Sequence, residues 1–382
     1  MACDRPGSEL AGVRRQMLKC LYRLPEADHL KRIGYSGVRE TNLMNFDMHT
    51  HFIAPEFVEA IRKPGSPWQA KLIKKGDEPW IEHDQGYSYP LTPGFHSTAA
   101  RLADMAAKKL DMAAVSVSPT LFYYWASPML ALDVATMTNN GLFALSRQHP
   151  EKFVGMGTLP MQNLELATKE LRRCVRDLGF KSIQIGSNVQ GVQFDDPQFL
   201  PFFKECEDLG VFVFFHPYYV GTKDMFTKYY LTNLYGNPLD TAMCVASLIF
   251  GGVLEQCPKL KVGFTHGGGF FPYQLGRLKH GYEVRGEAKV NRVRSPEKYL
   301  HQLYFDTIVF MDQQLRFLVE LAGADHVMLG TDYAFDMAEF APVDFVSGAG
   351  LPPAQLQAVL SGNARKLFGV DSAACAAAAE RS

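Results

Sequence analysis

The chain has 382 residues, of which 47% are hydrophobic and 21% are charged, so it can bury a large core. Its formal net charge of -1 gives no electrostatic basis for binding nucleic acid or an anionic membrane, and a small molecule is the expected partner. It lacks the run of about 18 apolar residues that a membrane span needs, and the first residues lack the apolar core of a secretory signal.

The cysteines are scattered along the chain, and no two of them form a Cys-x-x-Cys pair. There are seven: Cys3, Cys20, Cys174, Cys206, Cys244, Cys257 and Cys375. An odd and scattered set argues against a disulfide framework and against a thiolate zinc site. We therefore predict a reducing compartment and a cytoplasmic protein.

The first strand is predicted to carry two histidines. Residues 1–45 mix charge with short apolar pieces and are predicted to be an extension outside the main fold. The apolar run from Leu43 to Asp47 then predicts a buried strand that leads into His49 and His51. Because alternate residues of a strand point to one face, this pair could hold one metal ion. Two such histidines can equally be ordinary polar residues, so the pair alone is a weak signal.

A segment rich in Pro, Gly and Trp, residues 63–95, follows and predicts an irregular insertion of the kind that forms a wall or lid of an active site. From there, helical periodicity alternates with short β-like runs. The predicted helices are 100–110, 130–148, 164–178, 199–209, 239–254, 313–321 and 356–368. The predicted strands are 113–119, 153–159, 182–186, 211–216, 260–266, 303–308 and 326–332.

Eight predicted strands, counting the first, are each followed by helical sequence. Repeated βα units predict a parallel sheet, and eight of them favour a closed (β/α)8 TIM barrel. We expect this α/β domain to span residues 46–370, with residues 371–382 as a C-terminal tail. An open, doubly wound sheet is the alternative. No Gly-x-Gly-x-x-Gly follows the first strand, so a dinucleotide-binding fold gains no support.

Metal-competent side chains stand at the ends of the predicted strands, which is where TIM barrels carry their active sites. His49 and His51 end the first strand, His216 the fifth, His266 the sixth and Asp332 the eighth. Five candidate ligands from four strands therefore converge on one rim, which predicts a metal centre.

The remaining histidines do not share this placement, and an ordinary solvated or hydrogen-bonded side chain is favoured for each. They are His29, His83, His96, His149, His280, His301 and His326, the last of which begins a strand and so belongs to the opposite rim. Asp306, inside the seventh strand, could support a ligand histidine or be a satisfied core carboxylate.

The strand-end pattern resembles that of the amidohydrolase superfamily: Asp-x-His-x-His after strand one, His after strands five and six, and Asp after strand eight. Longer motifs resemble the aminocarboxymuconate-semialdehyde decarboxylase family, which includes the γ-resorcylate and 5-carboxyvanillate decarboxylases. These motifs are FVGMGTLPMQ at 153–162, LKVGFTHGGG at 260–269, FPYQLGR at 271–277 and LGTDYAF at 329–335. The resemblance runs from Phe46 to Val370.

The resemblance implies that His49, His51, His216 and Asp332 bind one divalent metal ion, usually zinc and in some relatives manganese. We expect zinc, with manganese as the alternative, and no organic cofactor. His266 matches a histidine beside the metal-bound water, and it is expected to act with Asp332 as a catalytic residue that passes a proton.

For the substrate, the resemblance implies a small carboxylate contacted by Arg277, Tyr218 and Phe335. Arg277 would reach into the site of a neighbouring subunit, which predicts a homodimer or higher homo-oligomer. The family's substrate-binding arginine after strand one has no counterpart, because there is no arginine between Lys63 and Arg101. We therefore expect a substrate other than the muconate semialdehyde.

The expected activity is non-oxidative decarboxylation of an aromatic or ring-cleavage-derived carboxylic acid. A hydrolase of an amide, lactone or C–C bond with the same mononuclear centre is the first alternative. A non-catalytic barrel that serves as a binding or scaffold protein is the second, and the presence of all five rim residues speaks against it.

Overall fold

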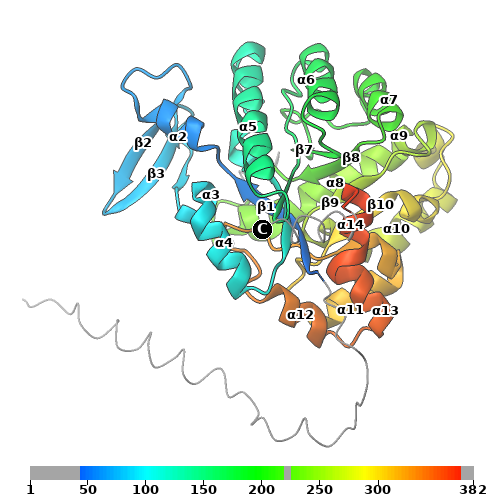
Figure 1. Ribbon diagram of the computed structural model, residues 1–382. Helices are drawn as coiled ribbons and strands as arrows, with labels where there is room; N and C mark the ends of the chain where they lie inside the picture. Colours follow the sequence, from blue (N-terminus) through cyan, green and yellow to red (C-terminus); the bar gives the residue numbers. More distant parts are fainter. Residues whose placement is uncertain (1–43, 219–224, 371–382) are drawn as a thin grey trace, which may run out of the picture. The chain divides into compact units, whose positions relative to one another are not determined.

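The structure is a computed structural model that describes residues 44–218 and 225–370 (Figure 1). They belong to the compact unit that begins at Met44. Residues 1–43 of the predicted extension and the predicted tail, 371–382, lie outside the described residues. In the described part of the chain, no helix combines the length and the apolarity needed to cross a bilayer.

Eight parallel strands form the centre of this unit. One sheet holds β1 (Phe46–Phe52), β5 (Met112–Val117) and β6 (Phe153–Gly155). The other holds β7 (Ser182–Gly186), β8 (Phe212–His216), β9 (Val262–Phe264), β10 (Leu303–Asp306) and β11 (Val327–Met328). Parallel bridges from Gly157 to Ile183 and from Thr50 to Tyr333 join the two sheets at both edges. The predicted TIM barrel is therefore confirmed, and the open-sheet alternative is wrong.

Helices follow the strands and surround them (Figure 1). The longer ones are α4 (Thr98–Ala107), α5 (Pro128–Gln148), α6 (Leu164–Arg176), α7 (Leu200–Asp208), α8 (Asn237–Phe250), α10 (Phe271–Val284) and α11 (Asp312–Ala322). Shorter ones are α2 (Pro55–Arg62), α3 (Pro93–His96), α9 (Val253–Gln256), α12 (Pro342–Gly348), α13 (Pro353–Gln357) and α14 (Asn363–Phe368). Ser97, Ser127 and Asn163 accept backbone hydrogen bonds at the starts of α4, α5 and α6, which fixes where these helices begin.

Most predicted strands differ in extent from the observed ones; 153–159, for example, is regular only over β6, and 260–266 only over β9. The differences in the first and the last strand bear on the site. β1 begins at Phe46 and continues to Phe52, so both histidines lie within it, because it pairs with β5 as far as Phe52 and Val117. The last predicted strand, 326–332, is regular only over β11. Beyond it the chain crosses to β1: the Leu329 carbonyl accepts from Met48 N (2.8 Å), and Asp332 N donates to the His49 carbonyl (2.9 Å).

The insertion after β1 is an ordered antiparallel sheet, so the prediction of an irregular segment is wrong. It comprises β2 (Ala70–Lys75), β3 (Glu78–His83) and β4 (Ser88–Pro90). Gly76, at φ 62°, starts the two-residue turn between β2 and β3, a conformation that favours glycine. Ile81 and Tyr89 face each other and are buried, a pairing that the many Pro and Gly residues around them concealed.

Apolar side chains fill the amino-terminal end of the barrel. This plug consists of Phe46, Met48, Met112, Ala114, Met156, Phe212, Phe214 and Met328, all nearly inaccessible to solvent. Each large apolar side chain buried there contributes about 1.5–3 kcal/mol. In β8 the inward positions run Phe212, Phe214, His216, so the plug ends where polar side chains begin. The plug thus forms the floor of the site at the carboxyl ends of the strands.

Candidate metal centre

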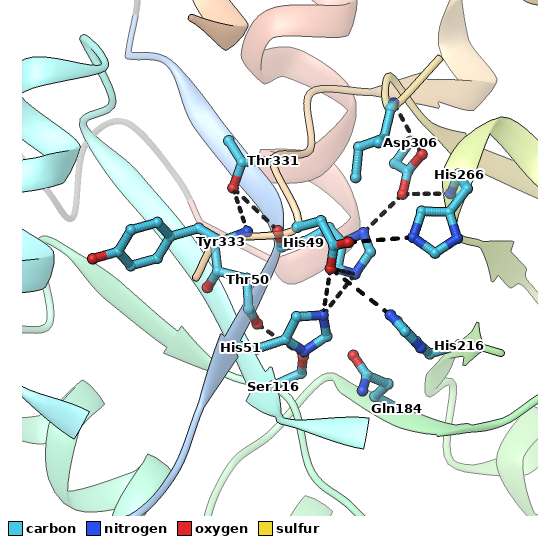
Figure 2. Close-up of polar contacts among 12 residues, drawn as sticks. His49, Thr50, His51, Ser116, Gln184, His216, His266, Asp306, Thr331 and Tyr333 are labelled. Atoms are coloured by element: carbon cyan, nitrogen blue, oxygen red, sulfur yellow. Dashed lines mark hydrogen bonds and ion pairs between the residues drawn. The ribbon is translucent and has the colours of Figure 1, made fainter. Parts of the chain in front are cut away.

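Four metal-competent side chains converge directly above the plug (Figure 2). His49 and His51 come from β1, His216 from the end of β8, and Asp332 from the segment after β11. All four are buried, and their ligand atoms lie within 4.8 Å of one another. The structure therefore brings together the four residues that the sequence predicts as one set.

A bulge in β1 sets which side chains face inward. The register with β5 shifts between Asp47 and Thr50, so that three residues of β1 span two of β5. Asp47 and Thr50 face outward toward Arg101 of α4, whereas His49 packs against Phe214 inside the barrel (5.1 Å between ring centroids). Only the two histidines are thereby directed into the site.

Each of the three imidazoles has an oxygen acceptor at its Nδ1 atom. The pairs are His49 with Asp306 Oδ2 (2.8 Å), His51 with the Val117 carbonyl (3.0 Å) and His216 with the Pro217 carbonyl (2.9 Å). A carbonyl or carboxylate oxygen can only accept, so Nδ1 carries the proton. The lone pair of each Nε2 is then free to bind a metal, as in metal-binding histidines generally.

The Nε2 atoms face one another and the Asp332 carboxylate. His49 Nε2 lies 3.0 Å from His51 Nε2, which in turn lies 2.8 Å from Asp332 Oδ1. His216 Nε2 is buried without a hydrogen-bond partner, 3.8 Å from the same oxygen. Such a group of inward-facing acceptors is unfavourable by itself and suits a divalent cation at its centre. The residues present therefore fit the metal ion that the sequence pattern predicts.

The electrostatics favour the protonation states that a metal requires. Burial lowers the pKa of His216 to about 3 and also lowers the pKa of His51, so both imidazoles are neutral at pH 7. Burial works against ionisation of Asp332, but the surrounding imidazoles hold its pKa well below the ordinary value. Neutral imidazoles and an ionised carboxylate can bind a cation without first releasing protons.

His266 lies beside this group without belonging to it. Its Nε2 is 3.4 Å from Asp332 Oδ2, whereas His51 contacts the other carboxylate oxygen, Oδ1. Burial opposes the charged form, yet the carboxylate of Asp332 raises the pKa of His266 above its ordinary value. The side chain also borders the cavity above the site. His266 is therefore placed to hold and release a proton next to a bound substrate.

The Asp306 carboxylate joins His49 to the His266 segment. Oδ2 contacts His49 Nδ1 (2.8 Å) and accepts from His266 N (2.9 Å), while Oδ1 accepts from Gly267 N (2.8 Å) and Ile308 N (3.1 Å). These contacts support a candidate ligand, which favours the first of the two roles left open by the sequence. One side chain thus orients both a ligand histidine and the adjacent proton carrier.

We expect Asp306→Asn to weaken metal affinity by roughly 10–100-fold, the range found for residues that orient metal ligands. Both oxygens of the Asp306 carboxylate accept hydrogen bonds, whereas an amide has one oxygen that accepts and an NH₂ group that donates. The variant therefore cannot accept from both His49 and the backbone N–H groups, and the imidazole loses its fixed orientation. Titration of metal-depleted protein measures the change. Asp325→Asn is the matched control, because Asp325 also pairs with a histidine, His326, but is exposed. Equal metal affinity of the two variants would contradict this role for Asp306.

A cavity of about 960 Å³ opens above the site. Its lining includes His216, His266 and Asp332, together with the predicted contact residues Tyr218 and Phe335. Gln85 and Tyr87 of the insertion also line it, in keeping with the prediction that the insertion forms a wall. Arg277 is exposed on α10 and is not among the described lining residues of its own chain.

The other described histidines lie away from the metal-competent group. His83 is buried in the insertion and hydrogen-bonds the Tyr123 hydroxyl (3.2 Å), and burial lowers its pKa to about 4. His326 Nδ1 contacts the Leu303 carbonyl (2.9 Å) at the amino-terminal end of the barrel, opposite the site. The ordinary hydrogen-bonded role predicted for these two is confirmed.

Sequence reasoning missed several polar residues that hold the site. Gln184, inside β7, lies near His216 (Figure 2) and donates from Nε2 to the Val117 carbonyl (3.1 Å), the acceptor that His51 also uses. The Ser116 hydroxyl donates to the Thr50 carbonyl (2.9 Å). A polar residue within an otherwise apolar buried strand was the signal that could have identified both.

Comparison with known proteins adds independent information. The family model described as "Amidohydrolase" matches residues 46–370. The chain belongs to the amidohydrolase family. Among curated amidohydrolase relatives, 2-amino-3-carboxymuconate-6-semialdehyde decarboxylase of Dictyostelium discoideum is 40% identical over 86% of this chain and 92% of its own. Gamma-resorcylate decarboxylase of Rhizobium sp. is 28% identical over 64% of this chain and 78% of its own.

A solved structure has the same fold. Dihydroxybenzoic acid decarboxylase of Polaromonas sp., with bound manganese and an inhibitor, superposes with a TM-score of 0.71. It is 21% identical and covers 87% of this chain and 98% of its own. The barrel fold predicted from the sequence is thus also found by comparison of three-dimensional structures.

Proposed function

We propose that this protein is a metal-dependent carboxy-lyase that removes carbon dioxide, without redox chemistry, from an aromatic or ring-cleavage-derived carboxylic acid. The observation that carries the proposal is the buried group of three imidazoles and one carboxylate, with His266 beside it at the base of a cavity. The names of its relatives supply the reaction class, since both curated relatives described above are decarboxylases.

In this proposal His49, His51, His216 and Asp332 hold one divalent cation. When bound, the cation would supply a positive charge that polarises an oxygen of the substrate. Three imidazoles and one carboxylate suit zinc, which we propose as the native metal. Manganese is the alternative, because a solved neighbour contains it.

His266 and Asp332 are the proposed catalytic residues. His266 would deliver a proton to the ring carbon that bears the carboxylate, and the electron pair of the C–C bond that breaks then returns to the ring as carbon dioxide leaves. Asp332 Oδ2, 3.4 Å from His266 Nε2, would stabilise the imidazolium before transfer. Phe335, 5.1 Å from the His51 ring, and Tyr218 would contact the substrate ring from the cavity wall.

A substrate carboxylate would also be stabilised by a positively charged side chain. The described lining of the cavity includes no lysine or arginine. We propose that Arg277 of a second copy supplies this charge, in a homodimer or higher homo-oligomer. The exposed position of Arg277 on α10, one turn from the lining residue Tyr273, is compatible with such a role.

We further propose that residues 46–370 form the catalytic domain, flanked by an extension and a tail, and that the protein is cytoplasmic. The extent of the family match supports the domain limits. Four free, buried cysteines, Cys174, Cys206, Cys244 and Cys257, support a reducing compartment.

The test is a screen of hydroxybenzoates and muconic semialdehydes with zinc- or manganese-loaded protein, with carbon dioxide release as the readout. Stoichiometric release that disappears on chelation and returns with the metal is the expected result. A hydrolase with the same centre is the second candidate, because the family's own description is "Amidohydrolase". Incorporation of ¹⁸O from water into product, without carbon dioxide release, would replace the proposal with this candidate.

A further inference from the structure

A buried arginine lies behind the strand that carries two of the candidate ligands. Arg101, in α4, is 1% exposed. Its Nη1 atom donates to the carbonyls of His51 (2.5 Å) and Gly94 (3.0 Å), and its Nη2 atom donates to Thr50 Oγ1 (2.8 Å). The guanidinium therefore contacts the backbone of a candidate ligand from the face opposite the imidazole.

The same guanidinium contacts the segment that carries the acidic ligand. Its Cζ atom lies 5.2 Å from the centroid of the Tyr333 ring, and Tyr333 directly follows Asp332. Figure 2 shows this ring pointing away from the imidazoles. The Tyr333 carbonyl accepts from His51 N (2.5 Å), so Arg101 touches both partners of the backbone pairing that links β1 to Asp332.

Asp47 completes the network behind β1. Its carboxylate is fully buried and accepts from Thr331 N (3.1 Å) and Thr331 Oγ1 (2.6 Å), one residue before Asp332. Arg101 and Asp47 are close enough to interact electrostatically. Arg101 and Asp47 thus hold the two neighbouring segments from which three of the four candidate ligands come.

Fold stability alone does not explain a charge at this position. The Nε atom of Arg101 is buried without a hydrogen-bond partner, so the desolvated guanidinium is incompletely satisfied. An apolar side chain of similar volume would often serve stability as well as a buried charge does. What the arginine provides and an apolar residue cannot is directional contact with three fixed acceptors.

We propose that Arg101 is a positioning residue of the metal centre, which sets the distance between the β1 ligands and Asp332 by holding the His51 carbonyl and the Tyr333 ring. This inference rests on the proposed function only in that it presupposes a metal at the four-residue group. It concerns the geometry of the ligands and is independent of the substrate.

The test compares Arg101→Met and Arg101→Lys in the full chain with Arg316→Met as the matched control. Arg316 is exposed, but like Arg101 it donates from Nη1 to a backbone carbonyl, that of Ala349 (2.9 Å), away from the site. Metal-depleted proteins are titrated with Zn²⁺ in competition with a chromophoric chelator. The visible spectrum of the Co²⁺-loaded proteins then reports the ligand geometry.

Arg101→Met is expected to weaken Zn²⁺ affinity by roughly 10–100-fold, as for other residues that orient ligands. Arg101→Lys, which keeps the charge but not the planar set of donors, should recover part of the affinity, and both should alter the Co²⁺ spectrum. Tyr333→Leu, which leaves the charge in place, provides a milder test if the arginine variants fail to fold, and it should change the spectrum in the same direction.

The inference is overturned if every variant that unfolds cooperatively has the same Zn²⁺ affinity and the same Co²⁺ spectrum as the unchanged chain. Because both readouts need no substrate, they separate this result from the proposed reaction. A chain that binds Zn²⁺ normally but releases no carbon dioxide from any candidate acid would count against the proposed function alone. Failure of the unchanged chain to bind a divalent metal would count against both.

Discussion

Replacing His266 with alanine is expected to leave the metal in place and to lower the rate of carbon dioxide release by roughly 10²–10⁴-fold, the usual contribution of a positioned proton carrier. The reason is geometric. His266 approaches the Asp332 oxygen that His51 does not contact, it borders the cavity, and the Asp332 carboxylate raises its pKa. Turnover assays and metal analysis on the same preparation measure the two effects.

The control for this variant is His280→Ala, in α10, where the imidazole is exposed. It should match the unchanged chain in both metal content and turnover. A His266→Ala protein that keeps full turnover, or one that loses its metal, would show that the role assigned to His266 is wrong: in the first case no proton transfer depends on it, and in the second it is a ligand.

Replacing Asp332 with alanine should abolish both metal binding and turnover. The carboxylate is the only anionic member of the four-residue group, and its Oδ1 atom lies within 3.8 Å of the Nε2 atoms of all three histidines. We expect a loss of metal affinity greater than roughly 100-fold, since residues that merely orient ligands already contribute about 10–100-fold. Metal analysis after dialysis, together with titration of the depleted protein, measures the loss.

Asp336→Ala is the matched control for this change. Asp336 lines the same cavity four residues further along and is exposed, so the variant removes one negative charge from the site without removing a candidate ligand. It should retain stoichiometric metal. If Asp332→Ala also retained stoichiometric metal, the three histidines would suffice for binding and the four-ligand assignment would be wrong.

The barrel and the metal-competent group could be predicted because both depend on short-range patterns. Alternating helical and β-like runs indicate βα units, and the fold itself requires the strand ends to meet at one rim. The placement of His216 at the end of β8 and of Asp332 after β11 could be predicted without knowing the structure of the intervening loops. The approximate strand position of each candidate ligand was therefore sufficient.

What could not be predicted depends on contacts between distant residues. The sheet of the insertion is stabilised by pairs such as Ile81 with Tyr89, which its Pro and Gly content obscured. The bulge that separates Asp47 from the face of His49 is visible only in the pairing with β5. Arg101, in an ordinary amphipathic helix, gives no sign in the sequence that its charge is buried behind the site.

The way the barrel closes indicates which part of the domain unfolds first. The seam between the first and the last strand contains little regular strand, because β11 has only two residues and β1 is joined to residues 329–333 by separate backbone hydrogen bonds. His51 and Asp332 face each other across this seam and are 281 residues apart in the sequence. A cation shared between them therefore closes a loop that includes nearly the whole domain, and clips across long loops restrict the unfolded chain most. A bound metal would therefore stabilise the folded domain in addition to its proposed part in the reaction. Loss of the metal would favour unfolding that begins where the first and the last strand meet.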